Sequence, residues 1–218
     1  MSLILKVGQD PSLSAEAIRR AARIIVGGGV VAFPTETSYG LGVLVSHREA
    51  IERVYQLKRR AYHKSLSILV GNLVELQEWV ETIPTEVVHL IERFWPGPLT
   101  LVFAAGEHFP TNLTGGTGKV AVRISSHPVA QALVQAVGTP ITATSANRSG
   151  APSCHSAPEV LAQLGSDLEA VLDGGLTPGS KDSTIADVTR RPPEILRVGA
   201  ITAHEVLSCW EEGAEHSL

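Results

Sequence analysis

A cluster of cationic side chains offers the clearest chemistry in this sequence. Lys58, Arg59, Arg60, His63 and Lys64 lie together in a chain of 218 residues with a formal net charge of −4. Lysine supplies a point charge and arginine a two-pronged donor for phosphate oxygens, so the cluster is a candidate triphosphate site. Side chains two residues apart diverge on a helix, so Lys58 and Arg60 can share a ligand only if a helix ends near Lys58. Solvated charge at a helix C-terminus, favoured by the helix dipole, is the alternative.

Arg123 lies inside the strand-like run 120–125, among apolar neighbours. An arginine is seldom fully buried without a partner. Its guanidinium is suited to clamp a carboxylate, and the alternative is an edge arginine whose stem packs on the sheet. Ser183 opens the run 183–187, where it either turns the chain into a strand or faces a ligand.

Hydroxyl and amide groups gather after Pro140. Thr144, Ser145 and Asn147 lie there, and Ser153 follows further along the same loop. These groups provide donors and acceptors for a nucleotide, although a turn satisfied by its own side chains is a common alternative.

Another polar segment follows the apolar run 30–33, which we expect to be a buried strand. Pro34 stops the run, and the five residues 35–39, beginning with Thr35, carry hydroxyl or carboxylate groups before Gly40 and Gly42. Polar groups at the exit of a rigid strand are well placed to meet a ligand. The alternative is an ordinary strand-to-loop turn whose polar side chains bind no ligand.

The elements that must position these groups are helices, predicted by apolar residues at helical spacing, and strands, predicted by short apolar runs. Helical patterns cover about 14–26, 49–57, 72–80, 84–94 and 128–137, and apolar runs typical of strands cover 3–7, 30–33, 66–70, 99–104, 120–125, 141–144, 170–173, 184–188 and 195–198. This order predicts an α/β fold with a mixed sheet. We expect one domain over residues 1–207 and a flexible acidic C-terminal tail over 208–218.

Composition narrows the class of protein. Apolar residues make up 44% and charged residues 18% of the chain, which is ordinary for a globular protein, and the net charge creates no field that would attract nucleic acid or membranes. Two cysteines and eight scattered histidines show no metal-ligand spacing, and no apolar run reaches transmembrane length. Residues 115–119 fail the P-loop pattern because Leu113 and Val120 stand at two required positions. We expect a cytoplasmic location.

Taken in order, the motifs resemble the YrdC family of threonylcarbamoyl-AMP synthases, in its single-domain form. The matching segments are 33–42, 58–60, 95–100, 122–124, 144–150 and 183–187, and together they span most of the chain. The resemblance implies an α/β fold with a single twisted sheet of parallel and antiparallel strands. Helices would flank the sheet, and the active site would lie on a concave surface.

The resemblance also implies roles for individual residues. ATP-binding residues would be Lys58, Arg60, Ser145, Asn147, Ser153 and Arg197, and L-threonine-binding residues would be Thr35, Ser67, Arg123, Thr144 and Ser183. No covalent catalytic residue is assigned, and Mg²⁺ would arrive with ATP. The family commonly has prolines where Ala61 and Ser65 stand here.

The implied function is nucleotidyl transfer. L-Threonine, bicarbonate or CO2 and ATP would give L-threonylcarbamoyladenylate and pyrophosphate, the first step of the tRNA N6-threonylcarbamoyladenosine (t6A37) modification. Partner proteins of the threonylcarbamoyl-transfer complex would then act on tRNA, which this chain would contact weakly or indirectly. A double-stranded RNA-binding or ribosome maturation module is the main alternative, and a carbamoyl-transfer domain of the hydrogenase-maturation kind is a further one.

Overall fold

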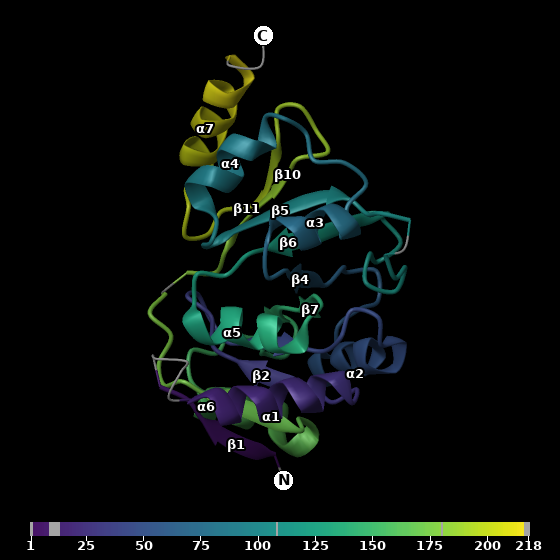
Figure 1. The fold of residues 1–218 in the computed structure, drawn as a ribbon, viewed down its shortest axis with the longest axis vertical. Helices are drawn as coiled ribbons and strands as arrows, with labels where there is room; N and C mark the ends of the chain where they lie inside the picture. Colours follow the sequence, from purple (N-terminus) through teal and green to yellow (C-terminus); the bar gives the residue numbers. More distant parts are fainter. Residues whose placement is uncertain (1, 9–13, 108, 180, 216–218) are drawn as a thin grey trace.

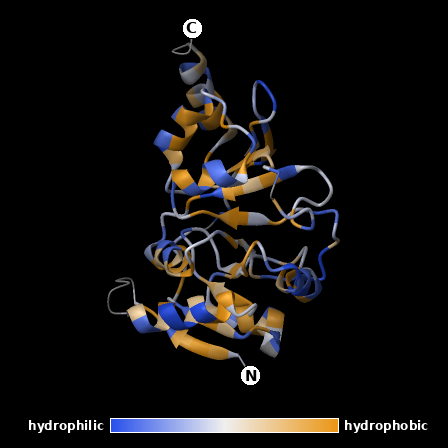
Figure 2. Ribbon diagram, turned by 45° about the vertical axis from the view of Figure 1, so that its right-hand side comes forward, coloured by the Kyte–Doolittle hydropathy of each residue, from blue (hydrophilic) through white to orange (hydrophobic). Residues whose placement is uncertain are grey.

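The computed structural model describes residues 2–8, 14–107, 109–179 and 181–215. The molecule is elongated, with the N-terminus at one end of the long axis and the C-terminus at the other (Figure 1). One sheet with its helices forms the half near the N-terminus, and a second sheet forms the half near the C-terminus. Apolar residues concentrate on the strands and on the helix faces turned toward them (Figure 2).

The first sheet has five strands. Their order is β1 (Leu3–Lys6), β9 (Ala170–Asp173), β2 (Val31–Phe33), β3 (Gly40–Gly42) and β8 (Thr144–Ser145). The first three strands are parallel, and β3 runs antiparallel to both β2 and β8. The strand predicted at 30–33 is therefore paired on both sides, which is why its three residues are fully buried.

The second sheet has six strands. Their order is β11 (Glu194–Arg197), β10 (Thr184–Asp187), β5 (Leu99–Ala104), β6 (Lys119–Arg123), β4 (Ser67–Leu69) and β7 (Ile141–Thr142). The β10–β5 and β6–β4 pairs are parallel, and the other neighbours are antiparallel.

Helices pack against both sheets. They are α1 (Ala15–Val26), α2 (Arg48–Lys58), α3 (Leu73–Trp79), α4 (Val87–Phe94), α5 (Pro128–Val137), α6 (Ala157–Leu164), followed by a short 3-10 turn, and α7 (Ala203–Glu215). Helices α1 and α5 pack on each other and on the first sheet, and α4 packs against α7. A continuous apolar core runs from β2 and β3 through α2 and β4 to β5 and α7, so the two halves share one interior.

The α/β class with mixed strand directions is confirmed, but the strands form two sheets rather than one. The strand predicted at 141–144 is divided at Ala143, whose backbone N–H donates to Ser67 at 2.8 Å. Residues before Ala143 pair with β4 of the second sheet, and residues after it pair with β3 of the first. A bridge between Leu44 and Ile141 links the sheets at the same place.

The C-terminal segment differs from the flexible tail predicted over 208–218. Helix α7 continues through Glu215, and Cys209 and Trp210 are buried against the core. Acidic residues suggested a solvated tail, but Glu211 and Glu212 lie on the exposed face of an amphipathic helix. Residues 216–218 lie outside the described part of the chain.

Among the residues that the structure describes, no helix is long and apolar enough to cross a membrane. Both cysteines, Cys154 and Cys209, are buried free thiols.

Candidate functional site

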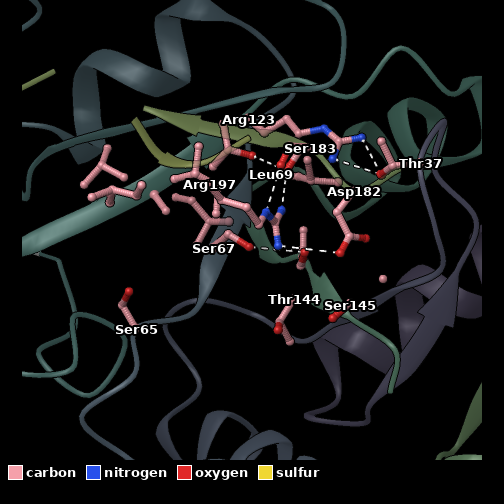
Figure 3. A pocket seen from close by; sticks show the side chains of 18 of the residues that line it. Thr37, Ser65, Ser67, Leu69, Arg123, Thr144, Ser145, Asp182, Ser183 and Arg197 are labelled. Carbon is pink, nitrogen blue, oxygen red and sulfur yellow. Dashed lines mark hydrogen bonds and ion pairs between the residues drawn. The ribbon is translucent and has the colours of Figure 1, made fainter. Parts of the chain in front are cut away.

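A cavity of about 490 Å³ lies between the two sheets. Eight of the residues predicted from the sequence line it, and they come from both halves of the molecule: Thr35, Arg60, Ser67, Arg123, Thr144, Ser145, Ser183 and Arg197. Figure 3 shows several of these side chains directed into the same space. The remaining three, Lys58, Asn147 and Ser153, lie behind the cavity wall.

The six-stranded sheet forms the roof of the cavity because its residues alternate between two faces. In β5, Leu99, Leu101 and Phe103 belong to the core, whereas Thr100 and Val102 line the cavity. In β6, Val120 and Val122 belong to the core, whereas Lys119, Ala121 and Arg123 line the cavity. This period of two is the physical reason why an arginine occurs in an apolar run.

Arg123 is buried and has a carboxylate partner from its own chain. Its Nη2 lies 2.7 Å from Oε2 of Glu36, and Nη1 and Nη2 each donate to Oγ1 of Thr37 at 3.2 Å. The Nε–H is buried without a hydrogen-bond partner. Arg123 therefore lines the cavity with its guanidinium largely paired inside the protein, and one buried donor is left unsatisfied.

Glu36 is held in its ionised form by this arrangement. Burial alone would raise the pKa of Glu36, but the positive charge of Arg123 and the hydrogen bond from Ser125 together lower the pKa below its usual value. Glu36 also accepts from the backbone N–H of Ser126 at 3.2 Å. The carboxylate thus ties the β2–β3 connection to the end of β6.

Thr35 organises the turn that carries these groups. Its hydroxyl donates to the carbonyl of Ser38 at 2.6 Å and accepts from the N–H of Thr37 at 3.2 Å. Tyr39 completes the segment, because its hydroxyl donates to Gly175 at 2.8 Å and accepts from Gly174 at 3.2 Å. The segment is consequently fixed from within and also by residues 174–175.

The wall next to this turn is built around Ser183, whose neighbour Asp182 accepts from Ser38 of the turn at 3.4 Å. The hydroxyl of Ser183 lies 2.9 Å from that of Thr100, and Arg197 donates through Nε to the carbonyl of Ser183 and through Nη2 to its hydroxyl, both at 3.0 Å (Figure 3). The Nη1 of Arg197 lies 3.7 Å from Oδ2 of Asp182. Asp182 also accepts from the hydroxyl of Ser153 at 2.9 Å.

Helix α2 ends at Lys58, which fulfils the geometric condition for Lys58 and Arg60 to converge, yet the two side chains separate. Arg59 takes a left-handed conformation at the helix end. The Nη2 of Arg60 donates to the carbonyl of Ser65 at 2.9 Å at the cavity edge. Lys58 turns inward instead and does not line the cavity.

Lys58 is buried beneath the Ser145–Asn147 loop. Its Nζ donates to the carbonyls of Ser145 and Asn147, the latter at 2.9 Å, and to Oδ1 of Asn147 at 3.2 Å. The hydroxyl of Ser145 donates to the same Oδ1 at 2.6 Å. Burial, with a smaller effect from the positive charge of Arg60, lowers the pKa of Lys58 to about 7. The predicted Lys-x-Arg and Ser-x-Asn groups are thus close together, with Lys58 supporting the loop.

Several lining residues were not identified from the sequence. Asp182 precedes Ser183 and was given no role. Lys119 belonged to a rejected P-loop and pairs with Asp187 at 2.7 Å across the sheet. The alternation of polar and apolar residues in 119–123 was the available signal for Lys119. Asp182 had no local signal, because its partners Ser38, Ser153 and Arg197 are distant in the sequence.

Comparison with known proteins agrees with this geometry. Residues 23–199 match the Sua5/YciO/YrdC family, which carries the description telomere recombination. The threonylcarbamoyl-AMP synthase of Pyrococcus abyssi is 39% identical over 94% of this chain and 60% of its own length. The threonylcarbamoyl-AMP synthase of Alkalilimnicola ehrlichii is 39% identical over 81% of this chain and 91% of its own length.

Solved structures give the same result. The crystal structure of P. abyssi Sua5 complexed with L-threonine superposes with a TM-score of 0.92 at 38% identity, covering 95% of this chain and 61% of that one. Escherichia coli YciO, at 24% identity, shares the fold with a TM-score of 0.83. The chain spans about 60% of the length of the P. abyssi protein and 58% of the Bacillus subtilis relative. The match over residues 23–199 and the identity to the A. ehrlichii enzyme show that this chain belongs to the Sua5/YciO/YrdC family.

Proposed function

We propose that this chain forms L-threonylcarbamoyladenylate from L-threonine, bicarbonate or CO2 and ATP, and releases pyrophosphate. The observation that carries the proposal is the cavity itself, which gathers a buried arginine, three further arginines and a set of hydroxyls from both sheets. Relatives of nearly the same length carry the name threonylcarbamoyl-AMP synthase, which supports the same reaction.

Arg123 would hold the carboxylate of L-threonine, beside Thr35 and Ser183. Arg60 and Arg197 both line the cavity and would bind the phosphates of ATP, together with Ser145. Lys58 and Asn147 would keep the Ser145 loop in place and approach the phosphates from behind it, with Ser153 nearby. Ser67 and Thr144 would complete the amino acid side.

The chemistry needs positioning and charge stabilisation rather than a covalent nucleophile. The free amine of threonine attacks CO2, so that a C–N bond forms and one proton leaves, giving a carbamate. A carbamate oxygen then attacks the α-phosphorus of ATP while the bond to pyrophosphate breaks. Arginines around the triphosphate would offset the charge that develops on the leaving group.

Mg²⁺ would enter with ATP. Within the described residues, no group of three or more His, Cys, Asp or Glu side chains is placed to hold a metal ion. A hydrated Mg²⁺ on a triphosphate requires only one or two carboxylates, so the lining residues are compatible with that form of the ion. Proteins of the threonylcarbamoyl-transfer complex would receive the adenylate and act on tRNA.

The test is direct. Purified protein incubated with ATP, Mg²⁺, bicarbonate and labelled L-threonine is expected to release pyrophosphate and to form a labelled adenylate. Omitting bicarbonate or threonine should abolish both products. A folded protein that forms neither product would refute the proposal.

A further inference from the structure

A second charged group is needed in this cavity if the proposed function holds. An α-amino acid arrives as a zwitterion, and both its charges must be paired when water is displaced. Arg123 accounts for the carboxylate, but the roles described above leave the ammonium without an acceptor. The inference below therefore rests on the proposed function and adds to it.

Two of the three carboxylates that line the cavity, and Glu36 beside it, are already neutralised by a nearby cation. Asp187 lies 2.7 Å from Nζ of Lys119, and it also accepts from Thr189. Glu194 lies 3.0 Å from Nε of Arg190, and Glu36 lies 2.7 Å from Arg123. A ligand ammonium would have to break one of these ion pairs to bind there.

Asp182 differs because its ion pair, with Arg197, is the longest of the four. Its Oδ1 accepts from the hydroxyls of Ser153 at 2.9 Å and Ser38 at 3.4 Å. Its Oδ2 has longer contacts, 3.2 Å to Ser153 and 3.7 Å to Nη1 of Arg197. Since an ionised carboxylate accepts about four hydrogen bonds, Oδ2 retains acceptor capacity toward the cavity.

The position of Asp182 relative to Arg123 fits the two ends of an amino acid. Arg123 contacts Thr37 and Asp182 contacts Ser38, which are consecutive residues of one turn. Both side chains line the same cavity, and Figure 3 shows both near Ser183. A cation and an anion therefore flank one short stretch of chain.

We propose that Asp182 accepts the ammonium group of the amino acid whose carboxylate Arg123 holds. Asp182 thereby selects zwitterionic α-amino acids against hydroxy acids of the same shape. The residue acts in binding, and the ammonium proton leaves before the amine attacks CO2.

The experiment compares L-threonine with 3-hydroxybutyrate, which keeps the carboxylate and hydroxyl but lacks the amine. Binding is measured by calorimetry on the whole chain without ATP or Mg²⁺. Wild-type protein is expected to bind threonine about 10- to 100-fold more tightly, the range of one charge-assisted hydrogen bond. Asp182→Asn is expected to lose most of this preference through weaker threonine binding, with 3-hydroxybutyrate affinity unchanged.

Asp173→Asn is the matched control. Asp173 lies nine residues earlier, ion-paired with Lys6 outside the cavity, and Asn keeps the oxygen that accepts from Gly175. This variant is expected to keep the wild-type preference. Loss of preference in Asp173→Asn as well would assign the effect to the loop and overturn the proposal.

Two further outcomes would overturn it. Asp182→Asn could retain the threonine preference and instead raise the Mg²⁺ concentration needed for activity, which would make Asp182 a metal contact. Wild-type protein could form the adenylate yet bind both ligands equally. This result would refute the inference, even if no Asp182 variant folds. It would leave the proposed function standing. Failure to form adenylate would refute the proposed function by a separate measurement.

Discussion

Lys58 carries an amine into the interior of the protein without an acidic partner in hydrogen-bond contact. Its three acceptors are oxygens of Ser145 and Asn147, so the side chain connects helix α2 to the loop after β8. Because the loop presents Ser145 to the cavity, Lys58 can influence a nucleotide both through its charge and through the position of the loop.

Lys58→Met tests this role while keeping most of the side-chain volume. We expect kcat/KM for ATP to fall by about 10- to 150-fold, equivalent to ~1.5–3 kcal/mol for a charge-assisted hydrogen bond. Steady-state kinetics with ATP varied at saturating threonine provide the measurement. Unchanged kcat/KM would remove Lys58 from the mechanism.

The lowered pKa of Lys58 also makes stability depend on pH. Between about pH 7 and pH 10 the unfolded chain holds a proton on Lys58 that the folded protein has released, so stability increases with pH by up to about 1.4 kcal/mol per unit. Below pH 7 both states are protonated and the burial cost is fully present. The stability of wild type relative to Lys58→Met, from urea unfolding, should therefore rise from pH 7 to pH 9. A difference that stays constant would show that the three oxygens hold the amine charged.

Glu36 and its ion-pair partner Arg123 are both largely buried. Glu36→Gln leaves the charge of Arg123 without a counter-ion, and we expect the free energy of unfolding to fall by about 3 kcal/mol. Glu52→Gln is the control, since Glu52 and its partner Arg48 are 42% and 78% exposed and such pairs contribute about 0–1 kcal/mol. Equal losses in the two variants would contradict the importance of the buried pair.

At the scale of elements, the loop 174–182 packs directly on the polar turn after β2. A Cβ built on Gly179 would lie 2.5 Å from the carbonyl oxygen of Glu36 and 2.8 Å from Cα of Thr37, both backbone atoms. Thr177 adds a hydrogen bond to the carbonyl of Thr37 at 3.1 Å. The glycine therefore permits the close approach that brings the loop to the cavity.

Gly179→Ala should separate these two segments. We expect about 1–3 kcal/mol of lost stability from overpacking, together with weaker threonine binding. Calorimetric titration and urea unfolding measure the two effects. Gly27→Ala is the control, because its φ is −78° and its nearest contact would be 3.3 Å. Threonine binding that survives Gly179→Ala would show that the loop does not position the site.

The elements also explain how far sequence reasoning could go. Long apolar periods predicted α1, α2, α5 and β5 because burial of one face determines them. Strand β3 could not be predicted, since Gly40-Leu41-Gly42 has little strand propensity and exists because Phe33 packs over both glycines. The transfer of the chain between sheets at Ala143 depends on Ser67, seventy-six residues away, and has no local signal.

At the scale of the whole molecule, the second sheet separates its stabilising face from its ligand face. Helices α3, α4 and α7 pack on the core side, and the cavity occupies the other. The same division limited prediction of the site, because residue types identified Arg123 and Ser183, whereas the partners Glu36 and Asp182 became recognisable only after the sheets came together.

This separation predicts that α7 stabilises the fold without touching ligands. Trp210 is 5% exposed and joins the core that contains Leu101 and Phe103. Trp210→Ala should cost about 3–5 kcal/mol of unfolding free energy, whereas the exposed neighbour Glu211, changed to Ala, should cost less than about 0.5 kcal/mol. Threonine affinity of the folded Trp210→Ala protein should stay within about twofold of wild type, because the cavity lies on the opposite face of β5. A Trp210→Ala variant as stable as wild type would mean that this segment is the mobile tail its acidic composition suggested, and a large loss of threonine affinity would mean that the two faces of the sheet are coupled.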